Sequence, residues 1–160
     1  MSIQPDFFFS RVEDIAIEFL KQQNIRLLIL DADATLIQSH DDKILPERVQ
    51  WVDAIRESGI RVMVGSNGKT YRIEKAFGSH KIEAYGYSLK PFPFRLNKRL
   101  KGYRRKEVLL VGDQFFTDIL CAKLLGIRSA MVEPYGTDEG FLIGFRRSLE
   151  KMIVKRKKAL

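Results

Sequence analysis

Cysteine and long hydrophobic runs are scarce in this chain of 160 residues. The one cysteine, Cys121, excludes an internal disulfide and a zinc cluster built from several cysteines. No apolar run approaches the ~20 residues that a membrane-spanning helix needs. The first residues, which include Asp6 and Glu13, lack the architecture of a signal peptide. We therefore expect a cytoplasmic protein.

The composition indicates a folded protein that binds something anionic. Hydrophobic residues make up 45% of the chain, which is typical of a globular domain, and we expect residues 1–160 to form a single domain. The formal net charge is +8. That excess favours nucleic acid, an acidic membrane surface or a phosphorylated substrate without choosing among them.

Short apolar runs alternate with helical patterns along the chain, which predicts βαβ units. The fold class that follows is α/β: a three-layer, Rossmann-like parallel sheet with helices on both faces. The predicted strands span residues 27–30, 60–64, 82–85, 107–111 and 128–132. The predicted helices span residues 11–23, 46–59, 70–77, 90–101 and 115–125.

The two ends of the chain flank this pattern. Residues 1–24 are expected to form a lead-in and the first helix, with the phenylalanines of residues 7–9 packed as a plug onto the sheet or that helix. The alternative is that these phenylalanines form a membrane-contacting patch. Residues 141–160 read as an amphipathic helix that becomes strongly basic. Such a helix is also typical of peripheral binding to anionic lipid.

Carboxylates follow the first predicted strand and the fourth. Asp31 and Asp33 come directly after the apolar run Leu27–Leu30, and Asp113 and Asp118 follow the run that ends near residue 111. Ligands of open α/β sheets bind at the carboxyl ends of the strands. Carboxylates suit Mg²⁺, so Asp31 and Asp113 are expected to hold it with Asp118 assisting. Asp33 is placed to protonate a leaving alkoxide and then activate water.

Polar residues at two further strand ends complete a phosphoryl-transfer set. Ser66 and Asn67 can bind phosphate oxygens at a helix start, and Lys90 can add a positive charge to the transferring group. Each signal alone has an ordinary explanation as a helix cap, a turn or a surface lysine. Their succession at strand ends favours a site.

Four stretches together resemble the motifs of the haloacid dehalogenase (HAD) superfamily. They are DADATL after the first strand, VMVGSN, Lys90-Pro91, and VGDQFFTD. The resemblance implies that Asp31 is the nucleophile and a metal ligand, and that Asp33 is the general acid and base with its backbone carbonyl on the metal. It also implies Mg²⁺ as the cofactor. The implied substrate contacts come from Thr35, Ser66, Asn67 and Lys90, and the remaining implied metal ligands are Asp113 and Asp118.

The finer resemblance is to the YqeG-type phosphatases of HAD subclass IIIA, which are similar to phosphatidylglycerophosphatases. That group usually carries Asp-Leu-Asp-Asn-Thr, whereas Ala32 and Ala34 stand at the second and fourth positions here. Only ten residues separate Thr35 from Pro46. Some twenty separate Gly68 from Lys90, and a predicted helix and strand use most of them, so no cap domain is expected at either position. An open cleft suits a large substrate.

Three functions fit these observations. The first is a Mg²⁺-dependent hydrolase that converts phosphatidylglycerophosphate to phosphatidylglycerol through an aspartyl-phosphate, at the inner face of a membrane. The second is the same chemistry on a soluble phosphate ester or nucleotide. The third is a basic module that binds RNA or ribosomes on a HAD scaffold. Residues 95–106 contain seven Lys or Arg and no acid, and residues 146–158 contain seven against one Glu. No recognised nucleic-acid module is present, so we expect no specific nucleic acid partner.

Overall fold

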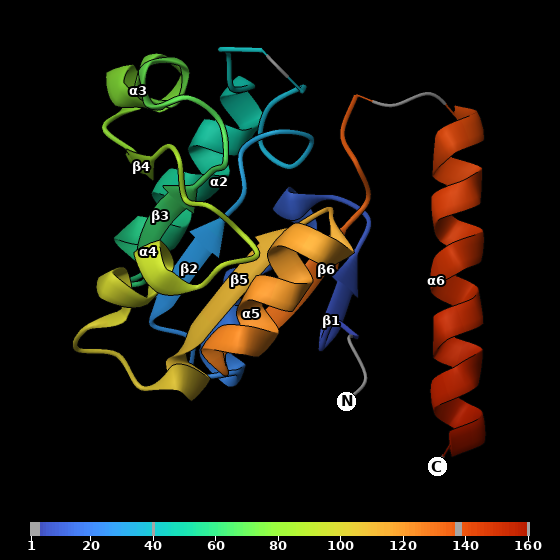
Figure 1. Ribbon diagram of the computed structural model, residues 1–160. Coiled ribbons are helices and arrows are strands. Elements are labelled where there is room, and N and C mark those ends of the chain that lie inside the picture. The colour runs from blue at the N-terminus through green and yellow to red at the C-terminus, as the bar shows by residue number, and fades with distance from the viewer. Residues whose placement is uncertain (1–3, 40, 137–138, 160) are drawn as a thin grey trace.

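Six parallel strands form one sheet in the order β1-β6-β5-β2-β3-β4 (Figure 1). The computed structural model describes residues 4–39, 41–136 and 139–159. The predicted parallel α/β sheet is confirmed, and β2 lies at its centre between β5 and β3. The strands are β1 (Phe7–Phe9), β2 (Leu27–Leu30), β3 (Arg61–Gly65), β4 (Glu83–Tyr85), β5 (Val108–Gly112) and β6 (Arg128–Val132).

Helices cover both faces of the sheet. The α-helices are α1 (Ile17–Gln22), α2 (Pro46–Glu57), α3 (Thr70–Phe77), α4 (Phe94–Asn97), α5 (Leu120–Leu125) and α6 (Glu139–Ala159). The 3₁₀ turns are η1 (Val12–Asp14), η2 (Gly78–His80), η3 (Lys98–Leu100) and η4 (Arg105–Glu107), and η5 (Phe115–Ile119) is a single π-helical stretch.

The alternation of side chains along β2 divides the core into two clusters. Leu28 and Leu30 face the cluster that α1, α2 and α3 supply, whereas Leu27 and Ile29 face the cluster of α4 and α5, which includes Cys121. All four residues of β2 are fully buried. Full burial of a leucine or isoleucine side chain contributes about 1.5–3 kcal/mol, so a strand that is apolar on both faces belongs in the middle of the sheet.

The phenylalanines of residues 7–9 form β1, a strand that was not predicted from the sequence, and they pack on the sheet and first helix as the plug interpretation expected. Residues Phe7–Phe9 pair in parallel with β6. The rings of Phe7 and Phe9 meet Phe19 edge-to-face, with centroids 5.0 and 5.2 Å apart. Aromatic packing onto α1 therefore holds this short edge strand in place.

The helix predicted over residues 11–23 is wrong in its first half. Residues 12–14 form the 3₁₀ turn η1, and Ala16 is extended before α1 begins at Ile17. The Trp51 indole donates to the Ile15 carbonyl at 2.9 Å, and Arg48 pairs with Glu13 at 3.1 Å. In a continuous helix the Ile15 carbonyl would accept a hydrogen bond from within the helix, whereas here α2 supplies its partner.

Two other predicted helices are also interrupted. The stretch 90–101 is helical only from Phe94, as α4 and then η3, and the stretch 115–125 begins as η5 before α5. Between β2 and α2, residues 31–39 and 41–45 contain an isolated bridge and no helix.

A last helix, α6, lies beside the edge of the sheet where β1 and β6 run (Figure 1). Its side chains are described only to residue 151, so the basic residues 155–158 of the predicted tail lie outside the described side chains. Among the described helices, none is long and apolar enough to cross a bilayer.

Candidate active site

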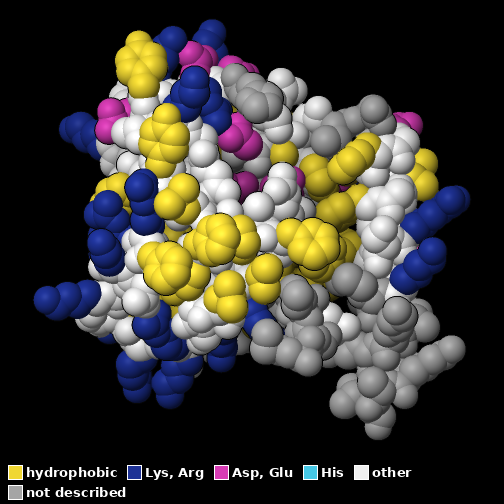
Figure 2. All heavy atoms as spheres, in the orientation of Figure 1, with side chains coloured by type: hydrophobic (Ala, Val, Ile, Leu, Met, Phe, Trp, Pro, Cys, Tyr) yellow, Lys and Arg dark blue, Asp and Glu magenta, His cyan; other side chains and the backbone are white. Residues whose placement is uncertain are grey.

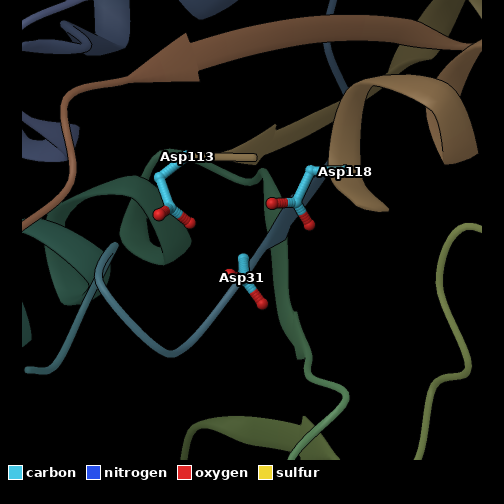
Figure 3. Close-up of side chains that lie close together, drawn as sticks. All are labelled: Asp31, Asp113 and Asp118. Atoms are coloured by element: carbon cyan, nitrogen blue, oxygen red, sulfur yellow. The ribbon is translucent and has the colours of Figure 1, made fainter. Parts of the chain in front are cut away.

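Three carboxylates meet at the carboxyl edge of the sheet. Asp31 directly follows β2 and Asp113 directly follows β5, and these two strands are neighbours. Asp118 comes from η5, which turns the chain back toward that edge. One oxygen from each of the three lies within 4.8 Å of the others, and Figure 3 shows the carboxylates turned toward one another. Asp118 is fully buried, and Asp31 is only 9% exposed.

Lys90 lies inside this acidic cluster and not at the solvated surface position that was the ordinary alternative for this lysine. Its Nζ donates to Asp31 Oδ1 at 2.8 Å and to Asp118 Oδ1 at 2.5 Å. Asn67 holds the backbone of Lys90 in place: its Nδ2 donates to the Lys90 carbonyl at 2.7 Å, and its Oδ1 accepts from the Lys90 N–H at 2.8 Å. These hydrogen bonds bring Lys90 and Asn67 together, although Lys90 lies five residues beyond the end of β4.

The electrostatics of the cluster favour an added positive charge. Burial, then repulsion from Asp118, raises the pKa of Asp31 to about 7, against the lowering effect of Lys90. Burial, then repulsion from Asp31 and Asp118, raises the pKa of Asp113 to about 8. Burial opposes the charge on Lys90, but the carboxylates of Asp118 and Asp31 outweigh it and raise the lysine pKa. One lysine therefore leaves the three acids incompletely neutralised.

The donor set fits a hard divalent cation. Asp113 Oδ1 is buried and has no hydrogen-bond partner among the described residues. A Cβ at Gly112 would lie 2.2 Å from Asp118 Oδ2, so only a glycine lets this carboxylate approach. Oxygen ligands of this kind suit Mg²⁺ and similar ions. An acidic triad able to hold a metal is thus present.

Ser66 and Thr35, the predicted phosphate contacts, lie buried beside these strands. Ser66 directly follows β3, and its Oγ accepts from the Gly68 N–H at 2.9 Å. Thr35 is 1% exposed, and its Oγ1 has no hydrogen-bond partner among the described residues. Their roles as substrate contacts stay predictions.

Asp33 lies apart from the three clustered acids, and Arg72 holds its carboxylate. Arg72 Nη2 donates to Asp33 Oδ2 at 2.6 Å, and its Nη1 donates to Asp33 Oδ1 at 2.9 Å. The sequence reasoning missed Arg72. The position of Arg72 in the predicted helix could have indicated it. Arg72 lies in the first turn of α3, where a positive charge is unfavourable next to the helix dipole, so an arginine at this position is expected to have an acidic partner.

Comparisons with known proteins identify the relatives of this chain. A family model described as mitochondrial PGP phosphatase matches residues 1–85, and a model described as HAD-hydrolase-like matches residues 88–139. The probable phosphatase YqeG of Bacillus subtilis is 27% identical over 152 residues, which cover 94% of this chain and 88% of that protein. The mitochondrial phosphatidylglycerophosphatase GEP4 of Saccharomyces cerevisiae is 32% identical over 119 residues, covering 64% of each.

The fold has solved counterparts as well. NagD from Escherichia coli K-12 superposes with a TM-score of 0.58 at 13% identity, covering 71% of this chain and 90% of that one. Fold, acidic cluster and sequence matches together define the class: this is a phosphatase of the HAD superfamily, of the YqeG type. Since the PGP phosphatase model matches more than half of the chain, the chain belongs to that family.

Proposed function

We propose that this protein is a Mg²⁺-dependent phosphomonoesterase that converts phosphatidylglycerophosphate to phosphatidylglycerol through an aspartyl-phosphate on Asp31. The observation that carries the chemistry is the buried contact of Lys90 with Asp31 and Asp118, beside Asp113. The family match and the name of the yeast relative support the lipid substrate.

In the first step a carboxylate oxygen of Asp31 attacks the phosphorus of the terminal phosphate. The bond from phosphorus to the glycerol oxygen breaks, and Asp33 protonates that oxygen. In the second step Asp33 takes a proton from water as the water oxygen attacks the phosphorus. The bond to Asp31 then breaks, and inorganic phosphate leaves.

Lys90 and the acidic cluster are proposed to offset the negative charge of the phosphate during both steps. Asp31, Asp113 and Asp118, with the backbone carbonyl of Asp33, would hold Mg²⁺, which offsets repulsion between the nucleophile and the phosphate. The ammonium of Lys90 already contacts the nucleophilic carboxylate and can reach a phosphate oxygen bound there. Ser66, Thr35 and Asn67 are proposed to orient the phosphate.

Arg72 holds Asp33 in a position from which it can act as an acid and a base. Each oxygen of Asp33 accepts one hydrogen bond from Arg72. Each carboxylate oxygen keeps a second lone pair that can carry a proton toward a substrate. Arg72 is therefore proposed to fix the position from which Asp33 exchanges its proton.

The substrate class separates the leading proposal from its alternative, a HAD phosphatase on a soluble ester or nucleotide. A phospholipid head group presented at the inner face of a membrane suits a basic protein, because anionic lipids attract Lys and Arg. Residues 95–106, with seven Lys or Arg, supply such a charge close to the Lys90 segment.

A substrate panel tests this proposal. Phosphate release from phosphatidylglycerophosphate in detergent is compared with release from glycerol phosphate, nucleotides and an aryl phosphate, with Mg²⁺ and with a chelator. We expect kcat/KM to be highest for the lipid, with loss of activity in the chelator and in Asp31→Asn. Asp53→Asn, an acid on α2, serves as the matched control with full activity. Equal activity of Asp31→Asn and wild type would refute the mechanism, and preference for a soluble ester would refute the substrate.

A further inference from the structure

Large apolar side chains stand exposed on the two segments that carry the active-site lysine and Asp118. Around Lys90 they are Tyr87, Leu89, Phe92 and Phe94, which are 46–70% exposed. Phe116, which is 76% exposed, lies two residues before Asp118. We call these five side chains, four aromatic and one leucine, the aromatic rim: Tyr87, Leu89, Phe92, Phe94 and Phe116.

The segment before α4 turns its polar side chains inward and its apolar ones outward. Ser88 and Lys90 are buried, whereas Tyr87 and Leu89 are exposed and adopt left-handed backbone conformations with φ of 48° and 59°. Large L-residues rarely adopt that conformation. A single exposed leucine would be ordinary, but here five large apolar side chains are exposed on two segments that Lys90 and Asp118 join, and such a group is typical of an interaction surface.

Charge around the rim identifies the kind of partner. No acid occurs in residues 84–106. Arg95, Lys98, Arg99 and Lys101 are exposed beside the rim, and Arg95 binds the Tyr87 carbonyl at 2.7 Å. Figure 2 shows apolar side chains gathered across the middle of one face, over α4 and α5, with Lys and Arg crowded at its left and lower left.

We propose that the aromatic rim inserts into the interface of an anionic lipid bilayer, with the flanking basic residues on the head groups, so that the active site opens onto the membrane. Aromatic side chains favour the interface of a bilayer, and basic residues next to them are attracted to anionic lipid. This inference rests on the proposed lipid substrate. It assigns docking to the mouth of the site and not to the basic helix α6.

Vesicle flotation tests the docking surface without any turnover. The full chain is floated with vesicles of phosphatidylcholine mixed with phosphatidylglycerol, as wild type and as the double variant Phe94→Ser/Phe116→Ser. We expect the double variant to bind about tenfold more weakly or worse, because its apolar contact is lost. It should still hydrolyse a soluble aryl phosphate. Lys98→Glu/Lys101→Glu should also weaken binding to anionic vesicles.

The matched control removes apolar side chains from α6. Phe141 and Ile143 are 57% and 49% exposed, so Phe141→Ser/Ile143→Ser also removes two exposed apolar side chains. We expect this variant to bind vesicles as wild type does. Loss of binding here, with binding intact in the rim variant, would overturn the proposal in favour of α6. Wild type that binds RNA and not vesicles would overturn it as well.

A tryptophan placed in the rim keeps the test informative if the serine variant fails to fold. Phe94→Trp preserves an aromatic side chain, and brominated lipid should quench its fluorescence well beyond the quenching of Trp51 in wild type. Absence of added quenching would overturn the proposal. Failure to hydrolyse phosphatidylglycerophosphate in detergent, with vesicle binding intact, would instead refute the proposed substrate and leave the docking surface standing.

Discussion

Arg72 and Asp33 form a two-point contact that links α3 to the loop after β2. Both guanidinium Nη atoms donate to the carboxylate, at 2.6 and 2.9 Å, and Nη1 also donates to the Asp41 carbonyl at 2.8 Å. A Cβ at Gly68 would lie 2.4 Å from Arg72 Nη2, so the glycine keeps the path of the arginine open. The position of the proposed general acid thus depends on a residue from another element.

We expect Arg72→Met to lower kcat for an aryl phosphate by about 10²-fold, because misplacement of a catalytic group by about 1 Å costs that much. Arg72→Lys should fall between wild type and Arg72→Met, since lysine keeps the charge but lacks the planar two-point geometry. KM should change little. Steady-state kinetics with Mg²⁺ measure both values, and thermal melting checks that each variant is folded.

Arg56→Met is the matched control for this prediction. Arg56 also binds one carboxylate and one carbonyl, those of Asp53 at 2.6 Å and Lys81 at 2.7 Å, but on α2. Its replacement should leave kcat unchanged. If Arg72→Met turned over as fast as Arg56→Met, the positioning role of Arg72 would be wrong.

The acidic cluster should make the stability of the metal-free protein fall as pH rises. The pKa values of Asp31 and Asp113 are about 7 and about 8 in the fold, against an ordinary value of 3.8 for aspartate. Between about pH 4 and pH 8 the folded state therefore holds more protons than the unfolded chain, and the free energy of unfolding falls across that window. Thermal melting in a chelator measures this fall.

Mg²⁺ should restore the lost stability, most strongly near the alkaline end of the window, where the carboxylates are ionised. Asp113→Asn supplies the control. In a chelator near pH 8 this variant should melt above wild type, because it removes one buried charge from the cluster, and Mg²⁺ should raise its melting temperature little. A wild-type protein whose metal-free melting temperature matched that of Asp113→Asn from pH 4 to pH 8 would contradict this account.

The sheet and its polar edge follow from local patterns. The run Leu27–Leu30 is apolar at every position, so the sequence alone predicts a strand that is buried on both faces. The acids that follow this run are therefore expected at the end of a strand. By the same logic Asp31 and Asp113 were expected together. Parallel pairing of β2 with β5 brings them there.

Contacts between loops could not be predicted in this way. The burial of Lys90 depends on Asn67, which holds its backbone from 23 positions earlier in the chain, and the placement of Asp33 depends on Arg72, 39 positions later. Helical periodicity over residues 11–23 also misled, because Arg48 and Trp51 bind the segment from α2. Tertiary contacts with side chains that are distant in the sequence override the local helix propensity of such a segment.

Ala34 illustrates a local feature that only the backbone reveals. It adopts φ of 58°, a left-handed conformation that costs an L-residue roughly 1–2 kcal/mol. Two backbone hydrogen bonds hold it there: its N–H donates to the Ile37 carbonyl at 2.8 Å, and its carbonyl accepts from the Tyr135 N–H at 2.6 Å. The conformation is thus imposed by neighbours and not by the alanine side chain.

Ala34→Gly should therefore stabilise the protein. Glycine removes the left-handed penalty but loses about 0.5–1 kcal/mol more chain entropy on folding, so we expect a net gain of up to about 1 kcal/mol in the free energy of unfolding. Urea denaturation measures it. Ala54→Gly, inside α2, is the control and should lose about 0.5–1 kcal/mol, because glycine there gains no conformational relief. If both variants lost stability equally, the backbone of residue 34 would not carry the strain inferred from its φ.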